Sequence, residues 1–196
     1  MQAYELRNQI IREHYTRSLE GTNNLLFYFA STAPMEDQRR KLPESVVHAL
    51  GLPSDVQSMY DYRSRYNGIY DRLYQQCVVS LCSDIEFMFK CVFERLQIQP
   101  GSGRGFFQRF RDVVSLLEEN GYNFEAVSDQ ISELEVAFNI RHIAIHNFGL
   151  TDEEFIRRTG YRLGSGVFYV LGQKEYRRMF EGYCNFLKCF DSQIDA

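Results

Sequence analysis

Apolar residues spaced by threes and fours run from residue 74 to residue 96, and this periodicity strongly limits the folds open to the chain. The spacing matches one face of an α-helix, and the residues that carry it are Tyr74, Val78, Leu81, Ile85, Met88, Val92 and Leu96. A helix of about six turns that is apolar on one side must pack that side against other elements. We therefore expect a helical bundle built around this segment.

Further helical patterns follow and favour an all-α fold. The stretch FFQRFRDVVSLLEEN, residues 106–120, is amphipathic and precedes Gly121, a typical helix stop. Two more helices are expected, one over residues 128–147 and one that closes the chain. Between them, YRLGSGVFYV, residues 161–170, is typical of a small β-hairpin because glycines separate two short apolar runs. The prediction is an all-α helical bundle with a small β-hairpin before the last helix.

The first third of the chain lacks this regularity. Three of the four prolines lie between residues 31 and 58, and no apolar periodicity is sustained there. We interpret residues 1–71 as an N-terminal arm with short helical turns, and residues 72–196 as the helical domain. Within the arm, NNLLFYFA fits a helix or a strand equally well. A stripe of tyrosines spaced by four favours packing on neighbouring helices, with base stacking as the alternative, and consists of Tyr62, Tyr66, Tyr70 and Tyr74.

Composition excludes several classes of protein. A net charge of -4 and a pI near 5.6 argue against coating nucleic acid through bulk charge, although a small RNA site is allowed. The five cysteines form no C-x-x-C pair and are odd in number, so we expect free thiols rather than a disulfide framework or a zinc ribbon. Neither a signal peptide nor a membrane-spanning run is recognisable. We expect a soluble, cytoplasmic protein without membrane contact.

A glycine-rich stretch, GSGRG at residues 101–105, is similar to a phosphate-binding loop at first sight. It lacks the lysine of a P-loop, and no β-strand is expected before it. We interpret it as a turn.

The segment NIRHIAIHNFG, residues 139–149, places polar side chains in an otherwise apolar helix. On a helical wheel, Arg141 lies at the centre of an apolar face because six apolar residues fall within about 60° of it, namely Leu134, Ala137, Phe138, Ala144, Ile145 and Phe148. An unpaired buried charge costs several kcal/mol. Arg141 therefore needs a carboxylate partner, for which Glu86 and Asp84 are candidates, or it borders a groove or a second subunit.

A second, polar line runs along the same helix. It lies about 100° to 160° from Arg141 and consists of Glu135, Asn139, His142 and His146. Much of the remaining circumference is apolar, since Val136, Ile140 and Ile143 occupy it. A helix with so little solvent-facing surface is usually central in a bundle or shared between subunits.

Three interpretations of this segment compete on the residues alone. The spacing of His142 and His146 fits a metal-binding pair, but the glutamate of zinc proteases is missing and no third ligand can be located. A polar face satisfied by internal hydrogen bonds is the second interpretation. The third is nucleolytic: a neutral histidine can take the proton of a ribose 2′-hydroxyl while a cation stabilises the pentacovalent phosphate. Neither step needs a metal, and we expect no metal and no cofactor.

The spacing of Arg141, His142 and His146, in R-HIAI-H, resembles the mark of the HEPN domains, a helical superfamily with many metal-independent ribonucleases of toxin and antiviral systems. The resemblance extends to CVVSLCSDIEFMFKCVF with its central acidic residue, to LEVAFNIRHIAIHNFG, to TDEEFI and to the closing helix. It covers roughly residues 72–194.

What the resemblance implies is an HEPN-like endoribonuclease that leaves a 2′,3′-cyclic phosphate and a 5′-hydroxyl. His146 would be the acid/base residue, Arg141 would stabilise the phosphate, and His142 would assist. Supporting or substrate-binding roles would fall to Asn139, Glu135, Asn147 and Glu86.

The resemblance also implies partners. Family members commonly dimerise through this helix, which fits a site in which Arg141 and His146 lie about 140° apart on one ideal helix. An RNA substrate, a homodimer and an antitoxin or sensor protein are the partners expected. The alternative is a noncatalytic helical module that binds a partner protein or a nucleotide.

Overall fold

The structure, a computed structural model, describes residues 3–23, 39–65 and 69–194. Within these ranges it is mostly helical, and the only β-type pairings are two isolated bridges. The α-helices are α1 (Gln9–Ser18), α3 (Glu44–Ala49), α4 (Met59–Arg65), α5 (Ile69–Leu96), α6 (Phe110–Glu119), α7 (Ser128–His146), α8 (Glu153–Thr159) and α9 (Gln173–Asp191). Short 3-10 or π turns cover Ala3–Glu5, Leu19–Asn23, Phe106–Gln108 and Glu125–Val127. The all-α prediction is confirmed.

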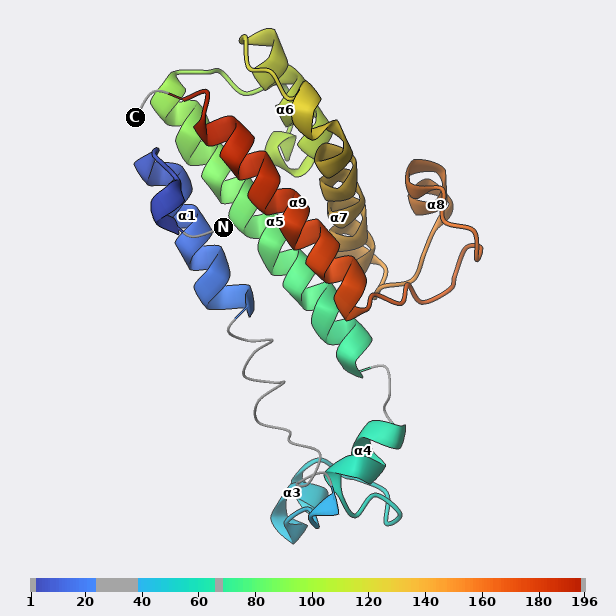
Figure 1. Ribbon diagram of the computed structural model, residues 1–196. Helices are drawn as coiled ribbons and strands as arrows, with labels where there is room; N and C mark the ends of the chain where they lie inside the picture. The colour runs from blue at the N-terminus through green and yellow to red at the C-terminus, as the bar shows by residue number, and fades with distance from the viewer. Residues whose placement is uncertain (1–2, 24–38, 66–68, 195–196) are drawn as a thin grey trace.

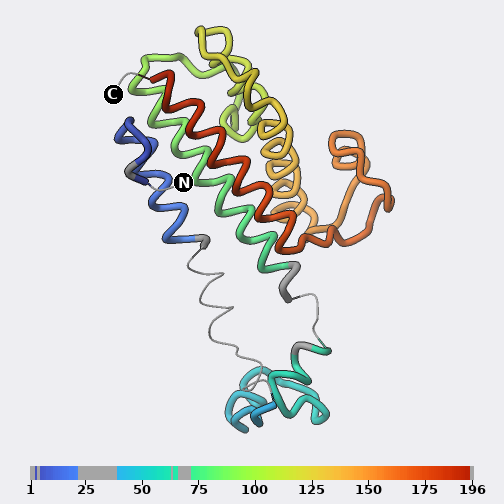
Figure 2. The backbone as a smooth tube through the Cα atoms, viewed as in Figure 1, coloured from blue at the N-terminus to red at the C-terminus, as the bar shows by residue number. Residues whose placement is uncertain are grey.

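The bundle is organised around α5, which has 28 residues. Helix α9 runs beside α5, and α1 lies along another side of α5 (Figures 1 and 2). Helix α7 packs against both α5 and α9, and it also contacts α6 and α8. The expectation that the unusual helix is central is therefore met, since α7 touches four other helices.

Aromatic side chains fill the space between these helices. The ring of Phe89 on α5 lies 5.9 Å from that of Phe186 on α9 and 6.0 Å from that of Phe110 on α6. Phe110 in turn stacks on Phe138 of α7 at 5.2 Å. Each fully buried ring of this size contributes about 1.5–3 kcal/mol, so this cluster fixes how α5, α6, α7 and α9 meet. The apolar face expected along α5 is buried from Val78 to Val92.

The predicted β-hairpin is wrong. Residues 161–170 contain no strand, and Phe168 instead forms an isolated bridge with Leu150. The reason is that Thr151 takes up the backbone groups that a hairpin would pair: its amide donates to the carbonyl of Val167 at 2.9 Å, and its hydroxyl donates to the carbonyl of Gly164 at 2.7 Å. The segment is a loop tied to the end of α7.

Helix α1 is fixed to the bundle at its start. The buried carboxylate of Asp191 on α9 accepts the backbone N–H groups of Arg7 and Asn8, each at 2.7 Å. The Asn8 side chain then caps α1 by accepting from the amides of Ile10 and Ile11. Part of the predicted arm thus lies against α5, while the division of the chain between residues 71 and 72 stays a prediction.

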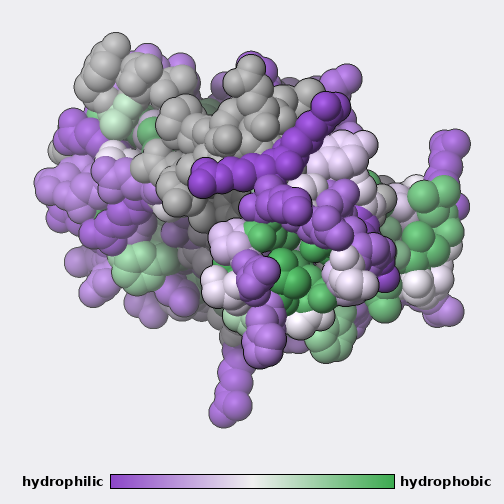
Figure 3. Space-filling model, turned by 90° about the horizontal axis from the view of Figure 1, so that it is seen from below, coloured by the Kyte–Doolittle hydropathy of each residue, from purple (hydrophilic) through white to green (hydrophobic). Residues whose placement is uncertain are grey.

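Residues 39–65 form a small helical unit that Figure 1 shows set apart from the bundle. Pairing of Lys41 with Ser58 closes the unit, and Val56 is buried in it. Seen from below, where α3 and α4 are nearest, hydrophobic side chains gather among hydrophilic ones (Figure 3). A groove of about 780 Å³ here includes Leu42, Val47 and Leu52.

Two features of the arm fall outside the described part of the chain. NNLLFYFA begins at Asn23 and otherwise lies in the undescribed range 24–38, and Tyr66 of the tyrosine stripe lies at 66–68. Tyr74, at the end of the stripe, packs against Tyr176 of α9 with ring centroids 5.9 Å apart. None of the helices in the described ranges is long and apolar enough to cross a membrane.

Candidate functional site

Arg141 on α7 forms an ion pair with Glu86 on α5. Its Nη2 atom lies 2.9 Å from Glu86 Oε1, and the two side chains are only 13% and 9% exposed. Of the two carboxylates that the sequence offered as partners, the structure brings Glu86 into contact. The pair explains how an arginine is accommodated on the apolar face of a central helix.

This ion pair is incompletely hydrogen bonded. Although the distance is short, the N–H bonds of the guanidinium are not aligned with Oε1, which accepts no hydrogen bond, and Arg141 Nε is buried without a partner. Burial raises the pKa of the Glu86 carboxyl, and this effect outweighs the opposing influence of Arg141 and Lys90. Both groups therefore keep unused hydrogen-bonding capacity in a largely dry environment.

The two histidines lie on the surface of α7 rather than in the core. Their ring centroids are 4.9 Å apart with the planes tilted by 50°, and both side chains are exposed. His146 is the last residue of the helix. An adjacent pair of solvent-accessible imidazoles can donate and accept protons without first being uncovered.

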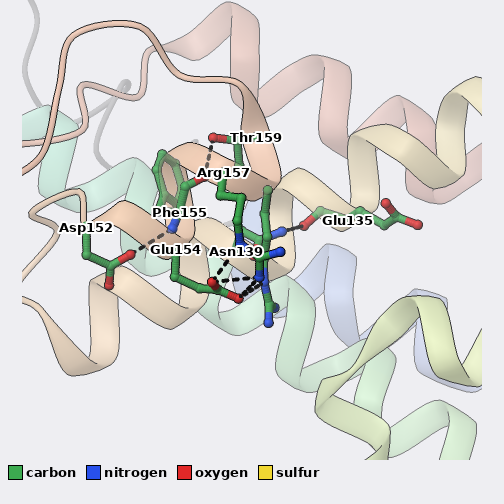
Figure 4. Close-up of polar contacts among 8 residues, drawn as sticks. Glu135, Asn139, Asp152, Glu154, Phe155, Arg157 and Thr159 are labelled. Atoms are coloured by element: carbon green, nitrogen blue, oxygen red, sulfur yellow. Dashed lines mark hydrogen bonds and ion pairs between the residues drawn. The ribbon is translucent and has the colours of Figure 1, made fainter.

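The other polar residues of this helix have structural partners. The Asn139 amide donates to the backbone carbonyl of Glu135 at 2.8 Å, as Figure 4 shows, and the Glu135 carboxylate lies 3.6 Å from Arg111 of α6. Asn147, directly after α7, donates to the carboxylate of Asp152. These contacts satisfy the side chains locally.

The arginines of α8 are also engaged. Figure 4 shows Glu154 bound to Arg157, and the same carboxylate accepts from Arg158 at 2.6 Å. Hydrogen bonds from these two arginines hold the pKa of Glu154 below its usual value. The basic run on α8 is thus partly neutralised by its own helix.

The chain leaves α7 through a strained and exposed turn. Phe148 has a left-handed backbone (φ 54°), which is uncommon for a residue with a side chain, and its ring is 78% exposed. Gly149 follows with φ 81°, and a Cβ there would lie 2.5 Å from the Gln75 side chain. Ile145, 49% exposed, and Leu150, 41% exposed, extend the apolar surface beside the histidines.

One chain brings some of the predicted site residues together and separates others. Glu86 meets Arg141, and His142 meets His146, but Arg141 has no hydrogen bond or ion pair with either histidine. The imidazoles face solvent, whereas the guanidinium is turned towards α5. Within the described residues, no group of three or more His, Cys, Asp or Glu side chains is placed to hold a metal ion.

Sequence reasoning missed what lies beyond Glu86. A cavity of about 310 Å³ is lined by Glu86, Lys90 and the loop at residues 101–105. Lys90 follows Glu86 by four residues, the spacing of neighbours on one helix face, and that signal was available in the sequence. Nothing in the sequence placed the loop beside the pair.

Compared with protein-family models, curated proteins and solved structures, the chain has no match in any of the three. The functional assignment therefore depends on the residues and their geometry.

Proposed function

We propose that the protein is a metal-independent endoribonuclease whose active site is completed in a homodimer. The observation that carries this proposal is the exposed His142–His146 pair, with ring centroids 4.9 Å apart, at the end of a helix that also carries Arg141. Two adjacent imidazoles supply a base for the 2′-hydroxyl and an acid for the leaving 5′-oxygen. The products would be a 2′,3′-cyclic phosphate and a 5′-hydroxyl.

The role of Arg141 is to stabilise the negative charge that grows on the phosphate. Glu86 approaches one of the three guanidinium nitrogens, and none of the guanidinium nitrogens donates a hydrogen bond to a described residue. A guanidinium carries five N–H donors, so a phosphate oxygen can bind while Glu86 holds the group in place. Such preorganised charge is often the largest contribution to catalysis.

A second copy of the chain is part of the proposal because one chain does not align Arg141 with the histidines. Ile145, Phe148 and Leu150 expose apolar surface beside His146, which supports contact with a partner there. In a two-fold dimer the same patch meets itself, so the imidazoles of one chain approach the arginine of the other.

The setting that fits such an enzyme is a cytoplasmic toxin or antiviral system, in which an antitoxin or sensor protein restrains it. The resemblance of R-HIAI-H to the HEPN ribonucleases supports this setting. The competing function is a noncatalytic helical module that binds a protein or nucleotide, and the burial of Arg141 against Glu86 favours it.

Incubation of mixed RNA with the purified protein in excess chelator separates the two functions. We expect cleavage with cyclic phosphate ends, and a loss of about 100-fold or more in His146→Ala because acid–base catalysis contributes that much. His48→Ala, an exposed histidine on α3, is the matched control and keeps full activity. Intact RNA, or equal cleavage by the His146 variant, refutes the ribonuclease.

The composite site is tested by sedimentation of wild type and Phe148→Asp. We expect a dimer that the charged substitution dissociates, with cleavage lost in parallel. A strictly monomeric wild type that still cleaves RNA would remove the second copy from the mechanism.

A further inference from the structure

The groove of about 780 Å³ in residues 39–65 lies outside the bundle and takes no part in the ribonuclease chemistry. The apolar residues that line it are Leu42, Val47, Leu52 and Val56. Only Val56 is buried, so the other three leave aliphatic surface open to solvent. Figure 3 shows hydrophobic side chains gathered among hydrophilic ones on this side of the molecule. We call this surface the arm groove.

Helix α3 contributes to the arm groove but buries none of its own side chains. It has six residues and no side-chain cap, and its Val46 is 37% exposed. Leu50, directly after the helix, is 60% exposed. An isolated helix this short is marginal in water, and no described element covers its apolar side. An uncovered apolar surface of this kind is typical of a site that binds another chain.

One end of the arm groove is basic. Lys41 lines the groove, and Arg39 and Arg40 directly precede it in the chain. All three side chains are exposed, and none forms an ion pair or a hydrogen bond with a described residue. Against these three cations stands one carboxylate among the described residues that line the groove, Glu44. The chain as a whole has a net charge of -4, so the positive charge is a local property of this segment.

The other carboxylates of residues 39–65 have partners of their own. Asp55 forms an ion pair with Arg65. Asp61 accepts hydrogen bonds from the hydroxyl and amide of Ser58, which hold the pKa of the Asp61 carboxyl below its usual value. These contacts leave the basic end of the groove without a counter-charge from either aspartate, and an acidic partner would supply one.

The walls of the arm groove fit a protein segment better than RNA. Proteins that bind single-stranded RNA stack its bases on aromatic side chains beside a basic track. None of the described residues that line the arm groove is a Phe, Tyr or Trp. Aliphatic grooves instead take up the apolar side chains of a partner segment, while charges at the rim fix its orientation.

We propose that the arm groove binds a segment of a partner protein in which aliphatic side chains lie next to acidic residues. The aliphatic side chains cover Val47 and Leu52, and the acidic residues pair with Lys41 and the two arginines before it. This binding site does not rest on the proposed ribonuclease, because the groove belongs to residues 39–65 and the histidine pair belongs to α7.

Synthetic peptides test the chemistry of the partner. We would titrate the full-length protein with a fluorescent peptide in which pairs of leucine alternate with pairs of glutamate. In a second peptide serine replaces leucine, and in a third lysine replaces glutamate. Oligouridine is the RNA probe, used with His146→Ala protein so that it stays intact. By fluorescence anisotropy we expect saturable binding of the glutamate–leucine peptide, and binding about tenfold weaker or less for the other three probes.

Two substitutions locate the binding site. Val47→Asp places a charge on the apolar wall and is expected to weaken binding of the glutamate–leucine peptide about tenfold or more, and Lys41→Glu about fivefold. The same changes at exposed positions outside the groove, Val170→Asp and Lys174→Glu, are matched controls without effect. The Lys41 side chain is exposed and has no partner among the described residues, so Lys41→Glu folds even if Val47→Asp does not.

Three results overturn the proposal. The first is equal binding of the three peptides, or no binding of any up to about 1 mM. The second is a preference for oligouridine that Lys41→Glu abolishes, which assigns the basic end to RNA. The third is self-association in sedimentation that Val47→Asp abolishes, which assigns the groove to a second copy of the chain. RNA cleavage by the wild type is measured separately, so either proposal can fail without the other.

Discussion

Asp84 and Glu86 are two residues apart on α5 and point to different sides of it, since two residues turn a helix by about 200°. Asp84 faces α1, whereas Glu86 faces α7 and the glycine loop (residues 101–105). Burial raises the pKa of both carboxyls, because both lose water. The two carboxylates differ in how completely hydrogen bonds within the protein replace that water.

On the α1 side, a hydrogen-bonded network replaces the water that Asp84 loses on burial. The Ser18 hydroxyl donates to Asp84 at 3.0 Å and lies 3.4 Å from the Tyr183 hydroxyl. His14 and Arg17, both on α1, oppose the effect of burial on the pKa of Asp84. The contacts of Asp84 therefore hold α1 against α5 and α9.

On the α7 side, the protein replaces only part of the water that Glu86 loses on burial. Glu86 has a cation 2.9 Å away but no hydrogen bond to its buried Oε1, and a cavity opens beside it. A satisfied carboxylate fixes helices, whereas an unsatisfied one next to a cavity retains capacity for a ligand. Two carboxylates within one helical turn thus have different environments.

The largest expected effect on stability comes from removing only one partner of the Glu86–Arg141 pair. Arg141→Met leaves a buried, unpaired carboxylate, and we expect a loss of about 3–5 kcal/mol in the free energy of unfolding. Urea denaturation measures it. The double variant Glu86→Leu, Arg141→Met removes both charges and is expected to recover most of the loss.

The double variant also decides whether the pair is needed for the fold. If it stays as unstable as the single variant, the packing of Arg141 rather than its charge is what α7 requires. If it recovers stability but loses RNA cleavage, the pair is retained for the proposed catalysis and not for stability.

A smaller effect is expected on the α1 side. Ser18→Ala removes the hydrogen bond to Asp84, and a bond to a charged group in such a position contributes about 1.5–3 kcal/mol. Amide hydrogen exchange should show the loss concentrated in α1, because Ser18 holds this helix together with the Asp191 contacts and the buried Ile11 and Tyr15 side chains. Uniform loss of protection across α5, α7 and α9 would contradict that local role.

Much of the bundle could be predicted because each helix carries its own apolar period. The period from Tyr74 to Leu96 lies within α5, and the helix expected over residues 128–147 is α7, which ends at His146. A helical wheel also required a partner for Arg141 and reduced the candidates to two carboxylates. These inferences use only neighbours along one helix.

What could not be predicted depends on contacts between distant segments. The choice of Glu86 over Asp84 is made by which side of α5 is covered by α1, and the position of the glycine loop follows from the packing of Phe106 on Gly101. The β-hairpin prediction was wrong for the same reason, since Thr151, more than ten residues away, forms hydrogen bonds with the backbone of this segment. Ile145 and Phe148, which the helical wheel placed on the same apolar face as Arg141, are exposed, because α7 ends where the bundle no longer covers it.

The smallest effect concerns the pH dependence of the α1 side, through His14. This imidazole is 6% exposed, and burial together with the nearby Arg17 lowers its pKa below 6.5. The unfolded chain therefore binds a proton near pH 6.5 that the folded protein does not bind until a lower pH. The stability contributed by neutral His14 is complete above pH 6.5 and is lost as the pH falls through its folded pKa.

Replacing the histidine isolates this contribution from the other titrating groups. His14→Gln keeps a polar side chain of similar size but cannot be protonated, so its unfolding midpoint should change less between pH 7 and pH 5.5 than that of wild type. Asp84 has the opposite sign, because its raised pKa favours the folded state as the pH falls, and it acts in a more acidic range. If the two proteins lose stability equally over this interval, His14 takes up its proton to the same extent in the folded and unfolded states, and burial of its neutral ring does not contribute to the pH dependence.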